Sequence, residues 1–311
     1  MVETVVSIGL AVDEKMIIKK NRIQLANLKG NEKRICIVTG IHGDELEGQY
    51  VCYELIRKIN ENIQFLNGIV DIYPALNPLG IDTIHRGMPT FDLDMNRIFP
   101  GSENGAMAEH VAAKIMEDID SADICIDLHA SNIFLKEVPQ VRISENMKDK
   151  LVPFAKLLNI DFIWVHPEST VLESTLSYNL NNRNIPTLLV EMGVGMRITK
   201  EYGDQLVDGI FNLMRKLNIW LGEVNAIREP IISAEKEVNF INANMSGVFM
   251  PCVQHLDKIK EGEEIGEIFN SLTGEIDEKV VSPCDGVIFT LREYPVVYEG
   301  SLIARVIGGA K

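Results

Sequence analysis

The chain has 311 residues, of which 46% are hydrophobic and 24% are charged, and its formal net charge is −15. This composition is typical of a soluble globular protein that forms one large domain or two ordinary ones. The negative charge argues against binding to nucleic acid or to an anionic membrane, so we expect neither as a partner. An anionic small-molecule substrate would need a local basic pocket.

The cysteines and the first residues favour a cytoplasmic protein. Five cysteines are scattered along the chain without a CxxC pair, which predicts buried free thiols. The first residues include the acid Glu3 and lack the basic segment of a secretory signal. No apolar run has the length of a membrane span. The oligomeric state stays open, with a homo-oligomer among the options.

Short apolar runs alternate with amphipathic ones over residues 34–220, and the first thirty residues predict a β-edge. Runs rich in Ile and Val predict buried strands at 34–40, 68–78, 122–129, 161–165 and 186–193. Helical spacing of apolar residues predicts helices at 44–62, 105–120, 145–159 and 199–221. Together they predict an α/β domain over 1–228, with a mixed, largely parallel sheet flanked by helices on both faces. From residue 229 to 311, short strand-like runs broken by turns predict a separate small all-β domain.

The stretch "TGIHGDELEG" places His42 and Glu45 three residues apart where a strand gives way to a helix. On a first helical turn this spacing would let both side chains bind one metal ion. The alternative is that Asp44 and Glu45 are only favourable anions at a helix N-terminus. If Glu45 is a ligand, we expect Asp44 to face elsewhere and support the turn.

Two further residues stand at the carboxyl ends of predicted strands, where ligands gather in open α/β sheets. His129 in "DICIDLHA" could complete a His, Glu, His set with a fourth position for water, as in catalytic zinc sites. The alternative is a core histidine with satisfied nitrogens. Glu191 in "TLLVEMGVG" ends an aliphatic strand and could act as a general base. The alternative is a structural glutamate in a salt bridge.

The segment "HRGMPTFDLDMNRIFPG" gathers polar side chains. An arginine beside an asparagine, here Arg97 beside Asn96, can fix a substrate carboxylate through charge-assisted hydrogen bonds. A second arginine, Arg86, could stabilise an oxyanion. The alternative is a surface loop with ordinary ion pairs.

Four motifs in this order, "GIHGDE", "DLDMNRIFPG", "DLHA" and "LLVEMG", resemble the succinylglutamate desuccinylase/aspartoacylase family, which is related to the zinc carboxypeptidases. The resemblance implies a zinc-carboxypeptidase-like fold and one zinc ion per chain on His42, Glu45 and His129. It also implies that Glu191 is the general base and that Asn96 and Arg97 hold a substrate carboxylate. Asp94 matches the acid that orients a zinc-ligating histidine in the wider superfamily, and Arg86 is the candidate oxyanion arginine.

The C-terminal region resembles a barrel-sandwich domain of the biotinyl/lipoyl type. A carrier domain of that type displays a lysine at a hairpin tip, whereas the connecting segment here offers only Lys279, at the start of a predicted strand. A swinging-arm role is therefore disfavoured. In the family this domain abuts the catalytic domain and can narrow the mouth of the active site.

The predicted activity is zinc-dependent hydrolysis of a linear amide in an N-acyl amino acid or a related small carboxylate-bearing amide. A metallocarboxypeptidase acting on short peptides would share the same metal site and stays an alternative. A non-catalytic binding protein is a further alternative, but such a protein would tolerate loss of Glu191 or of a zinc ligand, and all of these are present. The motifs leave the acyl group and the amino acid open.

Overall fold

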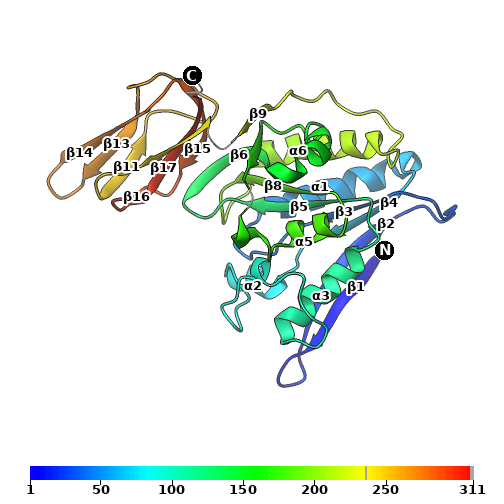
Figure 1. Ribbon diagram of the computed structural model, residues 1–311. Coiled ribbons are helices and arrows are strands. Elements are labelled where there is room, and N and C mark those ends of the chain that lie inside the picture. The colour runs from blue at the N-terminus through cyan, green and yellow to red at the C-terminus, as the bar shows by residue number, and fades with distance from the viewer. Residues whose placement is uncertain (168, 235–236, 309–311) are drawn as a thin grey trace.

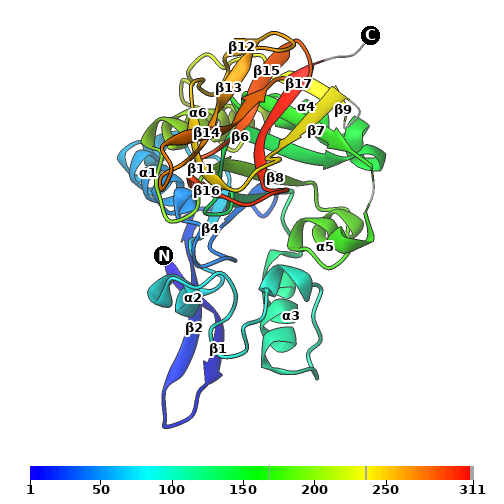
Figure 2. The ribbon, with the colours of Figure 1, turned by 90° about the vertical axis from the view of Figure 1, so that its left-hand side faces the viewer.

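The computed structural model describes residues 1–167, 169–234 and 237–308. Its main body is a large twisted sheet with helices on both faces (Figure 1). The strand order is β1 (Val2–Gly9), β2 (Lys15–Ile23), β4 (Ile69–Tyr73), β3 (Arg34–Val38), β5 (Ile124–Ala130), β8 (Thr187–Gly193) and β6 (Leu135–Ser144). Beyond β6 lie β7 (Phe162–His166) and β9 (Ile231–Ala234). The β1–β2 hairpin forms the edge and projects at one end of the molecule beside α3 (Met107–Ile119) (Figure 2).

The prediction of a mixed sheet is confirmed, although parallel pairing covers only part of it. Parallel pairing runs through β4, β3, β5 and β8, and again through β6, β7 and β9. Strand β2 meets β4 in antiparallel register, and β6 meets β8 in the same way. The five predicted strands are all present, but β6 was not predicted, and it is the strand that reverses the direction of the sheet.

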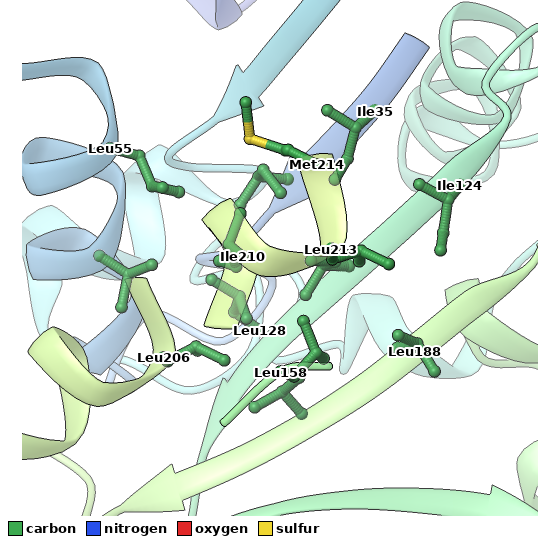
Figure 3. Close-up of a cluster of buried hydrophobic side chains, with 14 of the residues drawn as sticks. Ile35, Leu55, Ile124, Leu128, Leu158, Leu188, Leu206, Ile210, Leu213 and Met214 are labelled. Carbon is green, nitrogen blue, oxygen red and sulfur yellow. The ribbon is translucent and has the colours of Figure 1, made fainter. Parts of the chain in front are cut away.

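Two hydrophobic cores cover the two faces of the sheet because neighbouring residues of each buried strand point to opposite sides. In β3, Ile35 and Ile37 face one core and Cys36 and Val38 the other. The first core is closed by α1 (Glu47–Glu61), α4 (Lys148–Ala155) and α6 (Lys200–Lys216). Figure 3 shows the part of it where Leu55 of α1 and Ile210 of α6 lie near strand residues such as Ile35. The second is closed by α3 and by the short helix α5 (Leu176–Asn182), which was not predicted. None of the helices in the described residues is long and apolar enough to cross a membrane.

The C-terminal strands form two packed sheets at one side of the molecule (Figure 1). One contains β10 (Val238–Asn242), β12 (Lys258–Ile259), β15 (Gly286–Arg292) and β17 (Leu302–Gly308). The other contains β11 (Gly247–Pro251), β13 (Glu264–Asn270), β14 (Glu275–Val281) and β16 (Val296–Val297). Because β15 pairs with the first residues of β6, the first of these sheets is continuous with the large sheet. Lys279 lies within β14, where it pairs with Glu264, and not at the β13–β14 turn.

A buried ion cluster around Asp71 ties the N-terminal hairpin to the sheet, and it predicts a large loss of stability for Asp71→Ala. The Asp71 carboxylate is fully buried and accepts hydrogen bonds from Arg22 and Arg34. Its removal takes away the nearest carboxylate of both guanidiniums and leaves, among the described residues, only Glu3 and Asp118, each at 4.0 Å. Breaking a buried pair in this way costs about 3–5 kcal/mol. We expect a loss of that size in the free energy of unfolding, measured with denaturant. The matched control is Glu61→Ala, which breaks an exposed pair with Arg57 and should change stability by less than about 1 kcal/mol.

Candidate metal and catalytic site

His42 and Glu45 lie in a turn between β3 and α1, so the predicted helical spacing is wrong: α1 begins only at Glu47. The turn brings them together, and the backbone N–H of Glu45 donates to the carbonyl of His42. Glycines make the turn tight. Gly40 has a φ of +68°, and a β-carbon at Gly43 would lie 2.0 Å from the backbone of Gly80. The close approach of α2 (Pro78–Thr83) therefore restricts the backbone conformation of this turn.

The two histidines converge on Glu45, His42 from the turn after β3 and His129 from the end of the neighbouring parallel strand β5. Nδ1 of His42 lies 2.7 Å from one Glu45 oxygen, and Nδ1 of His129, at the end of β5, lies 2.9 Å from the other. All three side chains are buried, and one potential ligand atom from each lies within 4.8 Å of the others. The candidate ligand set predicted from the sequence is thus gathered at one point.

A carboxylate stands behind each histidine. Nε2 of His42 lies 3.0 Å from Asp94, the residue predicted to orient it, and Nε2 of His129 lies 3.2 Å from Asp127. Asp127 was not predicted, although its spacing could have revealed it: residues two apart on a strand point to the same face, and the motif is Asp-Leu-His. Such carboxylates fix the ring tautomer of metal-binding histidines.

The donor set fits a metal ion. Nε2 of His42 is hydrogen-bonded to Asp94, and Nε2 of His129 lies 3.2 Å from Asp127. Rings that carry their proton on Nε2 would turn their Nδ1 lone pairs to the oxygens of Glu45. Lone pairs this close need a cation between them. Nδ1 of His42 is buried and makes no hydrogen bond, in keeping with a ligand atom. Two imidazoles and one carboxylate are the ligands that catalytic zinc takes in proteins.

The carboxylates and histidines of this cluster stabilise each other's charged forms. Burial disfavours ionisation of Glu45, but the two histidine rings lower its pKa below the ordinary range. Burial opposes ionisation of Asp94 too, yet its hydrogen bond with His42 helps to lower its pKa to about 2. The carboxylates in turn raise the pKa of His129 well above its usual value, against the effect of burial. The cluster therefore favours positive charge at its centre.

Glu191 lies beside this cluster because β8 is the parallel neighbour of β5 and pairs Glu191 with His129 in register. Burial raises the pKa of Glu191, and the charges of Arg142 and His129 partly offset that effect. A raised pKa suits a carboxylate that must take up and return a proton. Arg142 forms a salt bridge with Glu191 at 3.5 Å, which is the structural alternative that the sequence left open, and Glu191 lines the cavity as well.

The predicted substrate-binding residues lie around the same cavity. Asn96 is buried, and its Oδ1 accepts the backbone N–H of Leu176, the first residue of α5. Arg97 donates to the backbone carbonyl of Asn96 and lines the cavity. Arg86 donates to Glu45 at 2.7 Å. Asp44 does not line the cavity; its carboxylate lies 3.9 Å from Arg86, and its carbonyl accepts the N–H of Met196.

A cavity of about 600 Å³ joins these groups. His42, Glu45, His129 and Glu191 line it, together with Asn96 and Arg97. Arg86 also lines it, so each of the eight predicted site residues lies at this cavity or, like Asp94, directly behind it. Two further lining residues, Arg142 and Arg305, were not predicted.

Comparison with known proteins gives a consistent result. Residues 31–217 match the sequence profile of the succinylglutamate desuccinylase/aspartoacylase catalytic domain. The N-alpha-acetyl-L-2,4-diaminobutyric acid deacetylase of Halomonas elongata is 22% identical over 89% of this chain and 83% of its own. The product-bound ectoine utilization protein EutE (DoeB) of Ruegeria pomeroyi superposes with a TM-score of 0.83 at 17% identity, covering 99% of this chain and 95% of that one. The succinylglutamate desuccinylase/aspartoacylase of Rhodobacter sphaeroides gives 0.79 at 20% identity, covering 100% and 96%.

Proposed function

Because the chain belongs to the succinylglutamate desuccinylase/aspartoacylase family, we propose that it is a zinc-dependent hydrolase that cleaves the amide bond of an N-acyl amino acid or a related small carboxylate-bearing amide. The observation that carries the proposal is the meeting of His42, Glu45 and His129 with Glu191 at one cavity. Deacylation is the activity in the name of the Halomonas relative, which supports this class of reaction. A cavity of about 600 Å³ suits a small substrate.

His42, Glu45 and His129 would hold the metal, with Asp94 and Asp127 orienting the two rings. Bound zinc would supply Lewis acidity, which lowers the pKa of water and polarises a carbonyl. The raised pKa of Glu191 suits it to remove a proton from the attacking water and to deliver it to the leaving amine.

Substrate orientation falls to Asn96 and Arg97. Because Oδ1 of Asn96 is taken by the N–H of Leu176, a substrate carboxylate would meet the Nδ2 donors, with the Arg97 guanidinium alongside. Fixing the carboxylate sets the position of the amide relative to Glu191. Arg86 would stabilise the developing oxyanion once its present partner, Glu45, is engaged by the metal.

A hydrolysis panel tests this function. We expect the zinc-loaded protein to release free amine from N-acyl amino acids, among them N-acetyl-L-aspartate, N-succinyl-L-glutamate and N-alpha-acetyl-L-2,4-diaminobutyrate. Short peptides of similar size serve as the comparison, and a sample treated with chelator is the control. Turnover confined to peptides would mean a carboxypeptidase, and absence of turnover throughout would refute the proposed hydrolase.

A further inference from the structure

Glu47 is a fully buried carboxylate that has no task in the reaction proposed above. It is the first residue of α1 and stands two residues after the candidate ligand Glu45. Its carboxylate accepts hydrogen bonds from the backbone N–H and the hydroxyl of Thr199, at 2.7 and 2.8 Å, and it forms no ion pair within the described residues. Burial of a carboxylate without a counter-ion is costly, so these hydrogen bonds must offset that cost.

The partner of Glu47 belongs to the segment that leaves β8, the strand that carries Glu191. This segment, residues 194–199, ends at Thr199, immediately before α6. At its start, Gly193 packs so closely on Oε1 of Glu47 that there is no room for a β-carbon. Glu47 therefore contacts the chain on both sides of segment 194–199, at the end of β8 and at the beginning of α6.

Two backbone hydrogen bonds tie the middle of the same segment to the loops beside the candidate ligands. The N–H of Met196 donates to the carbonyl of Asp44 in the turn after β3. The N–H of Gly195 donates to the carbonyl of Asn132, three residues beyond His129. The chain that follows Glu191 is thus joined to both parts of the protein that supply metal ligands.

Strand pairing supports the end of β8 only in part. The ladder with β5 ends at the pair Ala130 and Met192, one residue beyond Glu191. The ladder with β6 shifts register between the residues that pair with Gly193 and with Glu191. The contacts of Glu47 lie where this pairing stops, so they are placed to fix the direction in which the strand ends.

We propose that Glu47 is a positioning residue, which fixes the end of β8, and with it Glu191, relative to the turn that carries Glu45. The inference rests on the proposed function, in which Glu191 is the general base. Glu47 neither lines the cavity nor belongs to the candidate ligand set, so it acts through Thr199 and the strand end and not on the substrate or the metal.

Glu47→Gln tests this role with little change in side-chain shape. The amide keeps one acceptor oxygen and replaces the other with a donor, so at least one hydrogen bond from Thr199 is lost or reversed. For the substrate that the hydrolysis panel shows to be fastest, we expect kcat per bound zinc to fall by about 10- to 100-fold, because small displacements of a catalytic group have effects of this size. KM and zinc content should stay unchanged. A merely structural role would lower the fraction of folded, zinc-loaded protein and leave kcat per bound zinc as it was, and that result would overturn the proposal.

Thr199 supplies a second pair of variants that reach the same contact from the other side. Its side chain does not cap α6, so Thr199→Val removes the hydroxyl bonded to Glu47 without removing a helix cap. Thr199→Val should lower kcat in the same direction but less than Glu47→Gln, and Thr199→Ser, which keeps the hydroxyl, should be close to the wild type. The two effects should not multiply in the double variant, because both changes break one contact. Wild-type kcat in folded Thr199→Val would contradict the role of this hydrogen bond.

The matched control is Glu54→Gln. Glu54 is a buried glutamate of the same helix, but it pairs with Arg57. We expect kcat, KM and zinc content to stay at the wild-type values in this variant. A fall in kcat equal to that of Glu47→Gln would show that any buried change in α1 slows the reaction, which would remove the specific role of Glu47.

Amide hydrogen exchange tests the contact without turnover. The N–H groups of Gly195, Met196 and Thr199 are all hydrogen-bonded, and we expect them to exchange at least about 10-fold faster in Glu47→Gln, with β5 unchanged. Unchanged exchange together with unchanged kcat in that variant would refute the positioning role while leaving the proposed hydrolase intact. If the wild type hydrolyses no amide, the proposed function fails, and faster exchange in Glu47→Gln would still show that Glu47 holds this segment.

Discussion

Replacing Glu191 with glutamine is expected to lower kcat by about 10²- to 10⁴-fold, the usual contribution of a positioned general acid–base group. The amide of glutamine has nearly the same shape as the carboxylate, so the β8 strand and the cavity wall should keep their form. It cannot take up a proton from water at neutral pH or return one to a leaving amine. Zinc content should stay at one ion per chain, because Glu191 is not among the candidate ligands. The two measurements are steady-state kinetics and metal analysis on the same sample.

The control for this variant is Glu54→Gln on α1. Glu54 is also a buried glutamate, but it pairs with Arg57 and does not line the cavity, so turnover should be close to that of the wild type. Near-normal turnover in Glu191→Gln would remove Glu191 from the mechanism. A loss of zinc in that variant would show instead that Glu191 supports the metal site.

The location of the candidate site could be predicted from the sequence because it depends on adjacent parallel strands. β3, β5 and β8 are short aliphatic runs, and their carboxyl ends meet at one edge of the sheet. His42, His129 and Glu191 each follow or end one of these runs, so their convergence needs no knowledge of the loops. The local reason given for pairing His42 with Glu45 was nevertheless wrong, because a glycine turn and not a helix joins them.

The positions of the cavity-lining residues Arg142 and Arg305 could not be predicted, because they depend on β6, a strand that the sequence pattern does not indicate. β6 contains Pro139, a residue that normally argues against an interior strand. Here the ladder between β6 and β8 shifts register between Glu137 and Gln140, so the proline lies at an irregularity where its missing donor is tolerated. With β6 overlooked, Arg142 had no place in the sheet. Arg305 needed two further steps, the pairing of β6 with β15 and that of β15 with β17. The first joins Glu137 to Thr290, 153 residues later in the sequence, which no local pattern indicates.

Replacing His129 with alanine is expected to abolish stoichiometric zinc binding and, with it, hydrolysis. Only two of the three candidate protein ligands would remain, and both come from the same turn after β3. The ligand lost is the one that joins this turn to β5. Metal analysis after zinc loading and removal of free metal gives the direct measurement, and His110→Ala on α3, which does not line the cavity, should keep a full complement. A full complement in His129→Ala would show that the ligand set is wrong.

Asp127→Asn is expected to weaken zinc binding without abolishing it. Asp127 is not a candidate ligand, and its carboxylate lies beside Nε2 of the candidate ligand His129. Loss of the carboxylate that orients a metal-binding histidine typically weakens metal binding by about 10- to 100-fold, so this variant should bind zinc more weakly but still measurably. The three proteins should therefore rank wild type, Asp127→Asn and His129→Ala in order of falling zinc affinity in a competition titration with a chelator. The double variant should bind zinc no more weakly than His129→Ala alone, since the carboxylate has no ring left to orient. A further drop in the double variant would mean that Asp127 acts on the metal by another route than the His129 ring.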